Sequence, residues 1–400
     1  MLNRERQDFA VNIKMAPTLL VKFIIQVSFF LFSIIFPVNK HKVTFASYRS
    51  EQLEGNLLYI HREFNKRSQD FEFEFLFKKF NSTISGKLNY FLHMLKASYS
   101  LATSRFFIID DFYFPVYVVK QRKGTEVIQL WHAAGAFKKF GLSTINKPFG
   151  PSKEYLRHVK IHSNYSRVYV TSANVIPHYA EAFGMPQERI YPLGLPRTDY
   201  FFMDEEKAKV KQKFLDLFPE HDGKQLILFA PTFRGSSHYQ TKYTIPIDIG
   251  LLKDRIGDEY SFLIHLHPYM KSGIEIREDE KDFACQIGGE FTIEELLSLA
   301  DILVTDYSSI IFDYSLLRRP IVFFADDLER YKQDRDFYFE YESFIPGPLV
   351  ENANALATKI QQGNFDLKPV SDFRDFFFDR LDGKASERIV DHLLSNGKTN

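Results

Sequence analysis

The stretch DILVTDYSSIIFDYSLL, residues 301–317, contains an apolar run, a polar turn and a helical pattern in that order. Asp301–Thr305 has the length and composition of a buried strand, and Ile310–Leu317 has the apolar spacing of a helix. A buried strand that leads directly into a helix is typical of the parallel sheets of α/β proteins. This stretch therefore predicts a fold built from strands and crossover helices.

The same alternation extends in both directions along the chain, and we expect two Rossmann-like, doubly wound halves. Gly and Pro residues interrupt the pattern at Gly184–Pro196, so we place the division at 188/189. A last helix near Asp372–Leu394 is expected to pack back on the first half. The predicted strands are Val43–Ser47, Phe71–Phe77, Arg105–Asp110, Val127–His132 and Arg167–Thr171, followed by Gln225–Ala230, Ser261–His267, Asp301–Thr305 and Pro320–Ala325.

Composition limits the function classes. At 400 residues the chain is long enough for two domains, and 45% hydrophobic with 26% charged residues is typical of a globular protein. Lys+Arg and Asp+Glu are balanced at 51 each, which argues against nucleic acid as the main partner. The single cysteine, Cys285, excludes an intrachain disulfide and is interpreted as a packing residue in a strand.

The N-terminal segment, residues 1–40, contains the most apolar run of the chain, Leu19–Phe36. As a helix this run extends about 27 Å, close to the hydrocarbon thickness of a bilayer. Its polar residues Lys22, Gln26 and Ser33 fall within about 40° of one another on a helical wheel, which favours a helix lying in the membrane interface. A spanning helix and a helix buried in the domain remain alternatives. A secretory signal peptide is disfavoured because no small-residue cleavage site follows.

His132 ends a predicted strand and is followed by the small residues Ala133, Ala134 and Gly135. These small residues leave room for a substrate beside the imidazole, and an imidazole with a pKa near neutral is suited to accept a proton. The alternative is a buried histidine with a structural role. We treat His132 as the candidate general base, with Trp131 beside it.

The turn at residues 305–309 places Ser308 and Ser309 at the start of a helix, where backbone N–H groups attract anions such as a diphosphate. Ordinary capping by Asp306 or Ser308 is the alternative. Arg197 and Arg234 each follow a turn and could donate forked hydrogen bonds to phosphate, and a surface ion pair is the alternative for each.

His265 and His267 lie on one face of a predicted strand. Since no third ligand stands at close spacing, we expect hydrogen bonds to phosphate from these histidines and no zinc site. The chain also lacks the P-loop, dinucleotide-binding, nucleophile-elbow and HExxH motifs. The residues by themselves thus indicate an α/β protein that handles phosphate.

Six motifs in order resemble the CDP-glycerol glycerophosphotransferases of teichoic acid synthesis. They are WHAAGAFKKFG (131–141), GLPRTD (194–199), APTFR (230–234), HLHP (265–268), TDYSSIIFD (305–313) and PIVFFADDLERY (320–331). The resemblance implies a GT-B-like α/β fold with an interdomain active-site cleft. It implies an acceptor domain at residues 41–188 and a CDP-glycerol-binding domain at residues 189–400.

On this resemblance, the enzyme transfers glycerol phosphate from CDP-glycerol to a polyprenyl-diphosphate-linked saccharide acceptor in wall teichoic acid biosynthesis, and CMP leaves. It is expected at the cytoplasmic face of the cell membrane as a peripheral protein. His132 and His267 are the implied catalytic residues. The implied donor-binding residues are Trp131, Ala133, Ala134, Gly135, Arg197, Pro231, Thr232, His265, Ser308, Ser309 and Asp313.

The motifs depart from those of the polymerase members at Ala133–Gly135, where a Gly-Thr-Pro stretch is usual, and at His265, where an arginine is common. These departures favour an enzyme that adds the first one or few units. Transfer of ribitol phosphate or another group, and a non-catalytic scaffold at the membrane, remain alternatives. No cofactor is required by these residues, and assistance by Mg²⁺ stays open, as does the oligomeric state.

Overall fold

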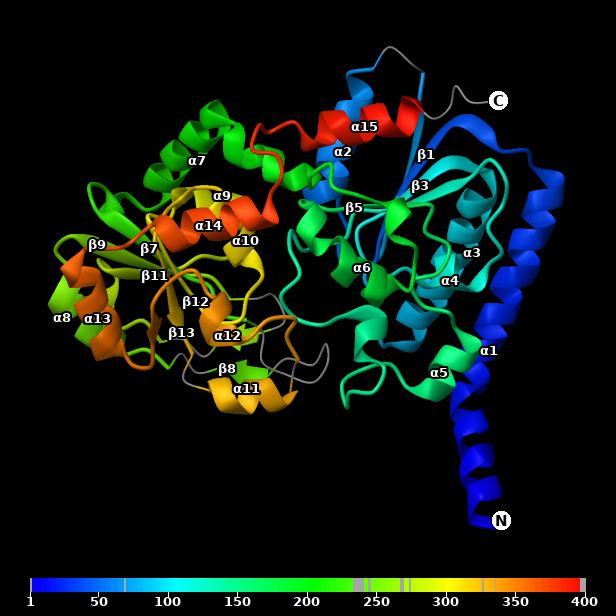
Figure 1. Cartoon of the computed structure of the whole chain (residues 1–400), viewed down its shortest axis with the longest axis horizontal. Coiled ribbons are helices and arrows are strands. Elements are labelled where there is room, and N and C mark those ends of the chain that lie inside the picture. Colours follow the sequence, from blue (N-terminus) through cyan, green and yellow to red (C-terminus); the bar gives the residue numbers. More distant parts are fainter. Residues whose placement is uncertain are drawn as a thin grey trace. The chain divides into compact units, whose positions relative to one another are not determined.

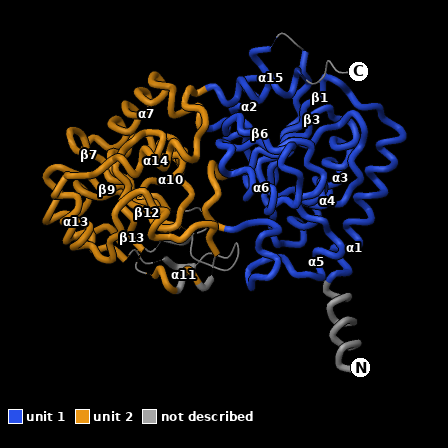
Figure 2. The backbone as a smooth tube through the Cα atoms, in the orientation of Figure 1, with its two compact units in different colours: residues 1–132, 139–197, 384–400 blue, residues 133–138, 198–383 orange. Residues whose placement is uncertain are grey.

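The computed structural model describes residues 2–67, 70–232, 241–243, 246–266, 270–272, 275–325, 327–334 and 336–395. The chain divides into two compact units (Figure 2). Unit 1 comprises Met1–His132, Lys139–Arg197 and Lys384–Asn400, and unit 2 comprises Ala133–Lys138 and Thr198–Gly383. The backbone therefore passes from one unit to the other several times.

Unit 1 contains a six-stranded sheet of order β2-β1-β3-β4-β5-β6 in which each neighbouring pair is parallel. Strand β1 is second in this order, with β2 paired on one side of it and β3 to β6 following on the other side. The strand order thus reverses between β1 and β3. The strands are β1 (Asn39–Ser47), β2 (Glu72–Phe77), β3 (Ser104–Ile109), β4 (Glu126–Gln129), β5 (Arg167–Tyr169) and β6 (Ile190–Tyr191).

Helices cover the sheet of unit 1 (Figure 1), and α15 packs beside α2 although the two are far apart in sequence. Their contact belongs to a core of fully buried side chains that includes Phe45, Ile60 and Ile389. The helices of this unit are α1 (Leu2–Ile35), α2 (Gly55–Asn65), α3 (Ile84–Thr103), α4 (Phe114–Val118), α5 (Lys153–His158), α6 (Ile176–Phe183) and α15 (Ala385–Ser395).

Helix α1 runs along α3 (Figure 1). Ile25 and Phe29 form its buried stripe, at 0% and 7% exposure, whereas Phe23 and Phe30 on the opposite face are 62% and 61% exposed. The segment Met15–Ile35 has a mean hydropathy of 2.2 over its most apolar window and is long enough to cross a membrane. The predicted N-terminal apolar helix is therefore confirmed, and one of its faces belongs to unit 1.

Unit 2 contains a second parallel sheet, of order β11-β9-β7-β12-β13-β14, and a short parallel pair of β8 (Thr241–Tyr243) with β10 (Met270–Ser272). Here the direction of building reverses between β7 and β12. The strands of the larger sheet are β7 (Gln225–Phe229), β9 (Tyr260–Ile264), β11 (Ala284–Gln286), β12 (Ile302–Thr305), β13 (Ile321–Phe324) and β14 (Leu349–Val350).

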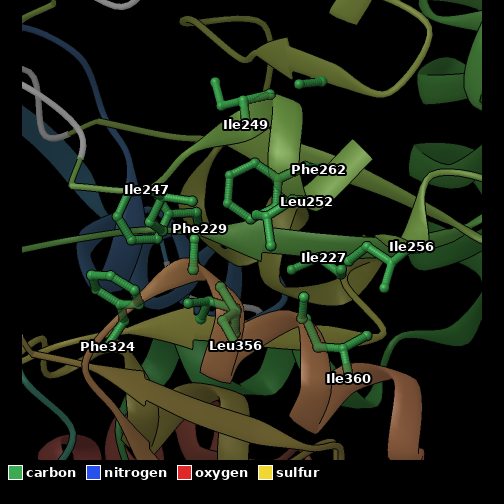
Figure 3. Packing of buried hydrophobic residues seen from close by; sticks show 14 of the residues in the cluster. Ile227, Phe229, Ile247, Ile249, Leu252, Ile256, Phe262, Phe324, Leu356 and Ile360 are labelled. Carbon is green, nitrogen blue, oxygen red and sulfur yellow. The ribbon is translucent and has the colours of Figure 1, made fainter. Parts of the chain in front are cut away.

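The main core of unit 2 joins this sheet to two helices (Figure 3). Phe229 and Phe262 on neighbouring strands stack at a ring distance of 5.9 Å, and Leu252 of α8 and Leu356 of α13 are fully buried in the same cluster. The helices are α7 (Asp204–Leu217), α8 (Ile249–Ile256), α9 (Ile293–Leu299), α10 (Ile310–Ser315), α11 (Leu328–Asp334), α12 (Tyr341–Phe344), α13 (Ala353–Gln362) and α14 (Lys368–Phe377).

The predicted α/β class with two Rossmann-like halves is confirmed, but local boundaries differ. Strand β4 ends at Gln129 and not at His132, because Trp131 takes a left-handed conformation with φ 57°. The last predicted helix is two helices, α14 and α15, and Gly383 with φ 66° lies between them. Only α15 belongs to unit 1.

The compact units differ from the predicted ranges 41–188 and 189–400 in three places, one of which is Ala133–Lys138, a segment of unit 2. Residues 189–197 lie in unit 1 because β6 pairs with β5, and Lys384–Asn400 returns to unit 1 because α15 contributes to its core. Cys285 lies in β11, as the sequence indicates, and burial raises the pKa of its thiol to about 12.

We expect Ile389→Ala to destabilise unit 1 by about 2–5 kcal/mol, because the Ile389 side chain is fully buried in the core and its removal leaves a cavity there. Urea unfolding followed by the fluorescence of Trp131, which lies in unit 1, measures this change. Glu387→Ala, an exposed change on the same helix, is the control. Equal midpoints for Ile389→Ala and the wild type would show that unit 1 does not depend on α15.

Candidate active site

Three polar side chains of unit 1 meet at the carboxyl ends of its strands. Ligands of open α/β sheets bind where the strand order reverses, which here is between β1 and β3. Arg49 follows β1, and its Nη1 lies 2.7 Å from Oδ2 of Asp111, which follows β3. His132 follows β4, and its Nδ1 lies 2.9 Å from the same oxygen. One carboxylate oxygen therefore contacts both an arginine and an imidazole.

The surroundings of this cluster set its protonation. Burial opposes ionisation of Asp111, but His132 and Arg49 outweigh it and hold the pKa of this carboxyl well below its usual range. Burial lowers the pKa of His132 from its ordinary 6.5. The Asp111 carboxylate raises this pKa, and the charge of Arg49 lowers it further. Near pH 7 the arrangement thus combines an ionised carboxylate with a neutral imidazole. The carboxylate favours the tautomer with the proton on Nδ1, so Nε2 can accept a proton.

The adjacent carboxyl of Asp110 differs from that of Asp111. Burial, together with the charge of Asp111, raises the pKa of Asp110 to about 7. At mildly acidic pH Asp110 is therefore protonated while Asp111 stays ionised. Two neighbouring carboxyl groups in one site thus hold different charges.

The backbone before His132 is held in a strained turn. A φ of 57° at Trp131 is rare for a bulky residue and costs on the order of 1–3 kcal/mol. Two buried side chains hold this conformation: Gln129 Oε1 accepts from Trp131 N at 2.7 Å, and Asn56 Nδ2 donates to Trp131 O at 2.8 Å. The turn fixes the direction in which the His132 imidazole leaves the backbone.

Arg197 contributes to the same turn. Its backbone N donates to Asn56 Oδ1 at 3.0 Å, and its Nη1 donates to His132 O at 2.7 Å. The resemblance assigned Arg197 to phosphate binding, and the structure gives this residue a contact that the sequence did not indicate. Trp131, His132 and Arg197 are thus brought together in unit 1.

A second group of predicted residues lies at the carboxyl ends of β7 and β12, where the strand order of unit 2 reverses. Thr305 Oγ1 donates to Ala230 O at 2.7 Å, and Thr232 N donates to Asp306 Oδ1 at 2.8 Å. These bonds tie the two strand ends together. The loops that carry Pro231, Thr232, Ser308 and Ser309 are therefore neighbours in unit 2.

Ser308 and Ser309 are half-buried at the start of α10. Ser308 Oγ accepts from Ile310 N at 3.4 Å, a long contact, and the side chain of the N-cap residue Ser309 makes no capping hydrogen bond to α10. Asp313 lies on the same helix and is 2% exposed. The helix is only six residues long, so its dipole is smaller than the sequence pattern indicated.

His265 follows β9, the neighbour of β7, and is half-buried. Burial lowers its pKa, and its Nδ1 is buried without a hydrogen-bond partner among the described residues. His267, the second predicted catalytic residue, lies outside the described residues, as does Arg234. Within the described part of the chain, no group of three or more His, Cys, Asp or Glu residues could hold a metal ion.

Ala133, Ala134 and Gly135 belong to unit 2. A Cβ at Gly135 would lie 2.3 Å from the ring of Phe312 in α10, and that ring is itself packed against Phe373 and Phe377. Glycine at this position is therefore required by close packing. Ala134 is 1% exposed and Ala133 is half-buried.

Sequence reasoning missed Arg49, Asn56 and Asp111. Asp111 follows the end of β3 closely, and this position after a strand is the signal that could have identified it. No motif marks Arg49 or Asn56, because each acts through a contact with a residue distant in sequence.

A family model and the similar curated proteins identify the same family. Residues 28–395 match the family model described as CDP-Glycerol:Poly(glycerophosphate) glycerophosphotransferase. The teichoic acid ribitol-phosphate primase of Bacillus spizizenii is 42% identical over 94% of this chain and 97% of that protein. The teichoic acid glycerol-phosphate primase of Bacillus subtilis is 30% identical over 76% of each. The solved structure of the wall teichoic acid polymerase TagF covers 99% of this chain and 98% of that one, with a TM-score of 0.73 at 21% identity, and thus shows a shared fold.

We expect Asp111→Asn to lower the pKa of His132 further, because the carboxylate raises that pKa whereas Arg49 and Arg197 lower it. The His132 imidazole would then gain its proton at a lower pH than in the wild type. NMR titration of the imidazole, assigned with His132→Gln, measures this shift, and Asp375→Asn in unit 2 is the control. A higher or unchanged pKa of His132 would show that the Asp111 contact is absent in solution.

Proposed function

Since the chain belongs to the CDP-glycerol:poly(glycerophosphate) glycerophosphotransferase family of teichoic acid primases and polymerases, we propose that it transfers a polyol phosphate from a CDP-linked donor to a polyprenyl-diphosphate-linked acceptor. The observation that carries this proposal is the contact between Asp111 and His132, with the imidazole neutral near pH 7. A neutral, oriented imidazole is what deprotonation of a hydroxyl requires.

In the proposed reaction His132 Nε2 accepts the proton of an acceptor hydroxyl while the oxygen of that hydroxyl attacks the β-phosphorus of the donor. A phosphorus–oxygen bond forms with the acceptor, the bond to the CMP phosphate breaks, and CMP leaves with the electron pair. Asp111 then stabilises the imidazolium. The positive charge of the His132 imidazolium thus lies beside the Asp111 carboxylate, which stays ionised.

The donor phosphates are assigned to residues of unit 2. Support comes from the grouping of Thr232, Ser308 and Ser309 at the strand-order reversal, where hydroxyl and N–H groups gather. His265 and His267 are further proposed donors to phosphate. The proposed mechanism relies on positioning and electrostatics, and it includes no resident cofactor.

We propose ribitol phosphate as the transferred group and priming as the step. The ribitol-phosphate primase is 42% identical over 97% of its length, whereas the glycerol-phosphate primase is 30% identical over 76% of its length. Glycerol phosphate, which the motifs first indicated, is the second candidate and is favoured by the description of the family model. Both candidates use the same base and the same leaving group.

Association with the cytoplasmic face of the cell membrane is part of the proposal. Phe23, Phe30 and Ile34 of α1 form one exposed apolar stripe, at 62%, 61% and 67% exposure. On the other face Lys22 Nζ donates to His158 O at 2.6 Å, so the charge is turned toward unit 1. A helix attached along one side and apolar on the other suits the plane of the interface better than a spanning position.

The transfer assay tests the reaction. Incubation with CDP-ribitol, CDP-glycerol or a UDP-sugar and a lipid-linked acceptor is expected to give a product heavier by one ribitol phosphate, identified by mass spectrometry. His132→Ala should lower the rate by about 10²–10⁴-fold because the general base is lost. Arg157→Ala, an exposed change in unit 1, is the control. Products from CDP-glycerol alone would correct the polyol, and no product from any donor would contradict the proposed function.

The membrane assignment predicts the effect of changing the exposed stripe of α1. Phe23→Ser, Phe30→Ser and Ile34→Ser together should release the protein from anionic vesicles, since each buried apolar side chain contributes about 1.5–3 kcal/mol. The buried stripe remains, so unit 1 should fold. Leu217→Ser with Leu381→Ser, which are exposed in unit 2, is the matched control. Vesicle co-sedimentation measures binding, and retention of the α1 variant on vesicles would exclude the stripe as the anchor.

A further inference from the structure

Unit 1 contains a cavity of about 520 Å³ that the mechanism above does not use. Its apolar wall includes Leu142, Ile145, Leu156, Phe183 and Met185. Binding sites for small organic ligands are commonly 300–1,000 Å³ and mostly apolar, with a few polar groups that fix the orientation of the ligand. The cavity has the size and the lining of such a site.

The charged residues at this cavity are cations. Lys160 and Arg189 line it, both are exposed, and neither forms an ion pair with a described residue. No Asp or Glu is among the lining residues. A guanidinium and an ammonium beside an apolar wall suit a ligand that has both an apolar chain and a phosphate group.

Aromatic contacts connect the cavity to the candidate base. His162 and Phe183 line the cavity, and their rings lie 5.7 Å and 5.3 Å from that of Trp131. The Trp131 ring also lies 4.5 Å from the ring of His132. Trp131 therefore contacts both the cavity wall and the candidate base, and neither Trp131 nor His132 lines the cavity itself.

The cavity is also connected to the apolar helix. Leu156 reaches the cavity from α5, and α5 ends at His158, whose carbonyl accepts the hydrogen bond from Lys22 of α1. The same short helix thus forms a wall of the cavity and a support for α1. A ligand held in a membrane beside α1 would meet this part of unit 1 first.

We propose that this cavity binds the isoprenyl diphosphate portion of the acceptor, with the diphosphate at Lys160 and Arg189 and the first isoprene units against the apolar wall. The assignment rests on the proposed function, which supplies the acceptor class. The saccharide of the acceptor then extends past Trp131 toward His132. The cavity is an anchoring site for the lipid end of the substrate, separate from the residues that perform the chemistry.

The chain offers a direct measure of occupancy because Trp131 is its single tryptophan. Farnesyl diphosphate is the probe, and binding is followed as a change in Trp131 fluorescence, without donor or turnover. We expect saturable binding of farnesyl diphosphate and much weaker binding of farnesol or inorganic diphosphate, because each of these has only half of the recognised chemistry.

Lys160→Gln with Arg189→Gln should weaken farnesyl diphosphate binding by about 10–100-fold, since two charge-assisted contacts are lost. Met185→Glu should weaken it as well, by placing a negative charge beside the diphosphate. Lys123→Gln with Lys153→Gln removes the same charge from exposed positions that do not line the cavity and should leave binding unchanged. Thermal unfolding of each variant establishes that it is folded.

Three results would overturn the proposal: no saturable fluorescence change, equal loss of binding in the test and control pairs, or equal affinity for farnesol and farnesyl diphosphate. In the transfer assay, the test pair should raise the KM for the lipid-linked acceptor and leave the KM for the donor unchanged. Because binding is measured without turnover, failure of the wild type to transfer any polyol phosphate would contradict the proposed function and not the cavity assignment.

Discussion

Parallel strand pairing is the constraint on which both units depend. A parallel pair cannot be closed by a tight turn, so each strand is followed by a crossover that returns the chain to the same edge of the sheet. All carboxyl ends of a sheet therefore lie on one edge. Arg49, Asp111 and His132 come from three separate crossovers, yet the carboxylate of Asp111 contacts both of the others. The contacts of the candidate base therefore depend on the alignment of the strand ends in unit 1.

Burial then gives the edge its electrostatic character. Asp111 has 6% of its side chain exposed, and an ionised carboxylate at such a position needs partners of opposite charge or hydrogen-bond donors. Arg49 supplies the charge, which leaves the imidazole of His132 free to remain neutral. The strain at Trp131 is maintained by Asn56 and Gln129, both buried, so the direction of the imidazole is fixed before any substrate arrives.

The sequence predicted what depends on short-range pattern. Apolar runs located the strands, and His132 and Ser308 were recognised because each follows such a run. Long-range contacts were not visible: Asn56 acts on Trp131 from 75 positions away, and α15 joins a core whose other members lie in the first half of the chain. Gly135 was assigned to donor binding from the motif, whereas only the position of the Phe312 ring shows why a side chain does not fit there. The catalytic role of His267 stays a prediction, because this residue lies outside the described part of the chain.

The position of α15 affects how the protein is made. Its side chains Ile389, Val390 and Leu393 complete the core of unit 1, but they are synthesised after all of unit 2. While translation continues, the surface of α2 that α15 covers stays exposed to water and to other nascent chains. Unit 2, whose segments all precede Lys384, can fold while the ribosome still holds the carboxyl end. Unit 1 begins before unit 2 and is completed after it, so a chain that ends before Lys384 would have a complete unit 2 and, on unit 1, an apolar patch suited to chaperone capture.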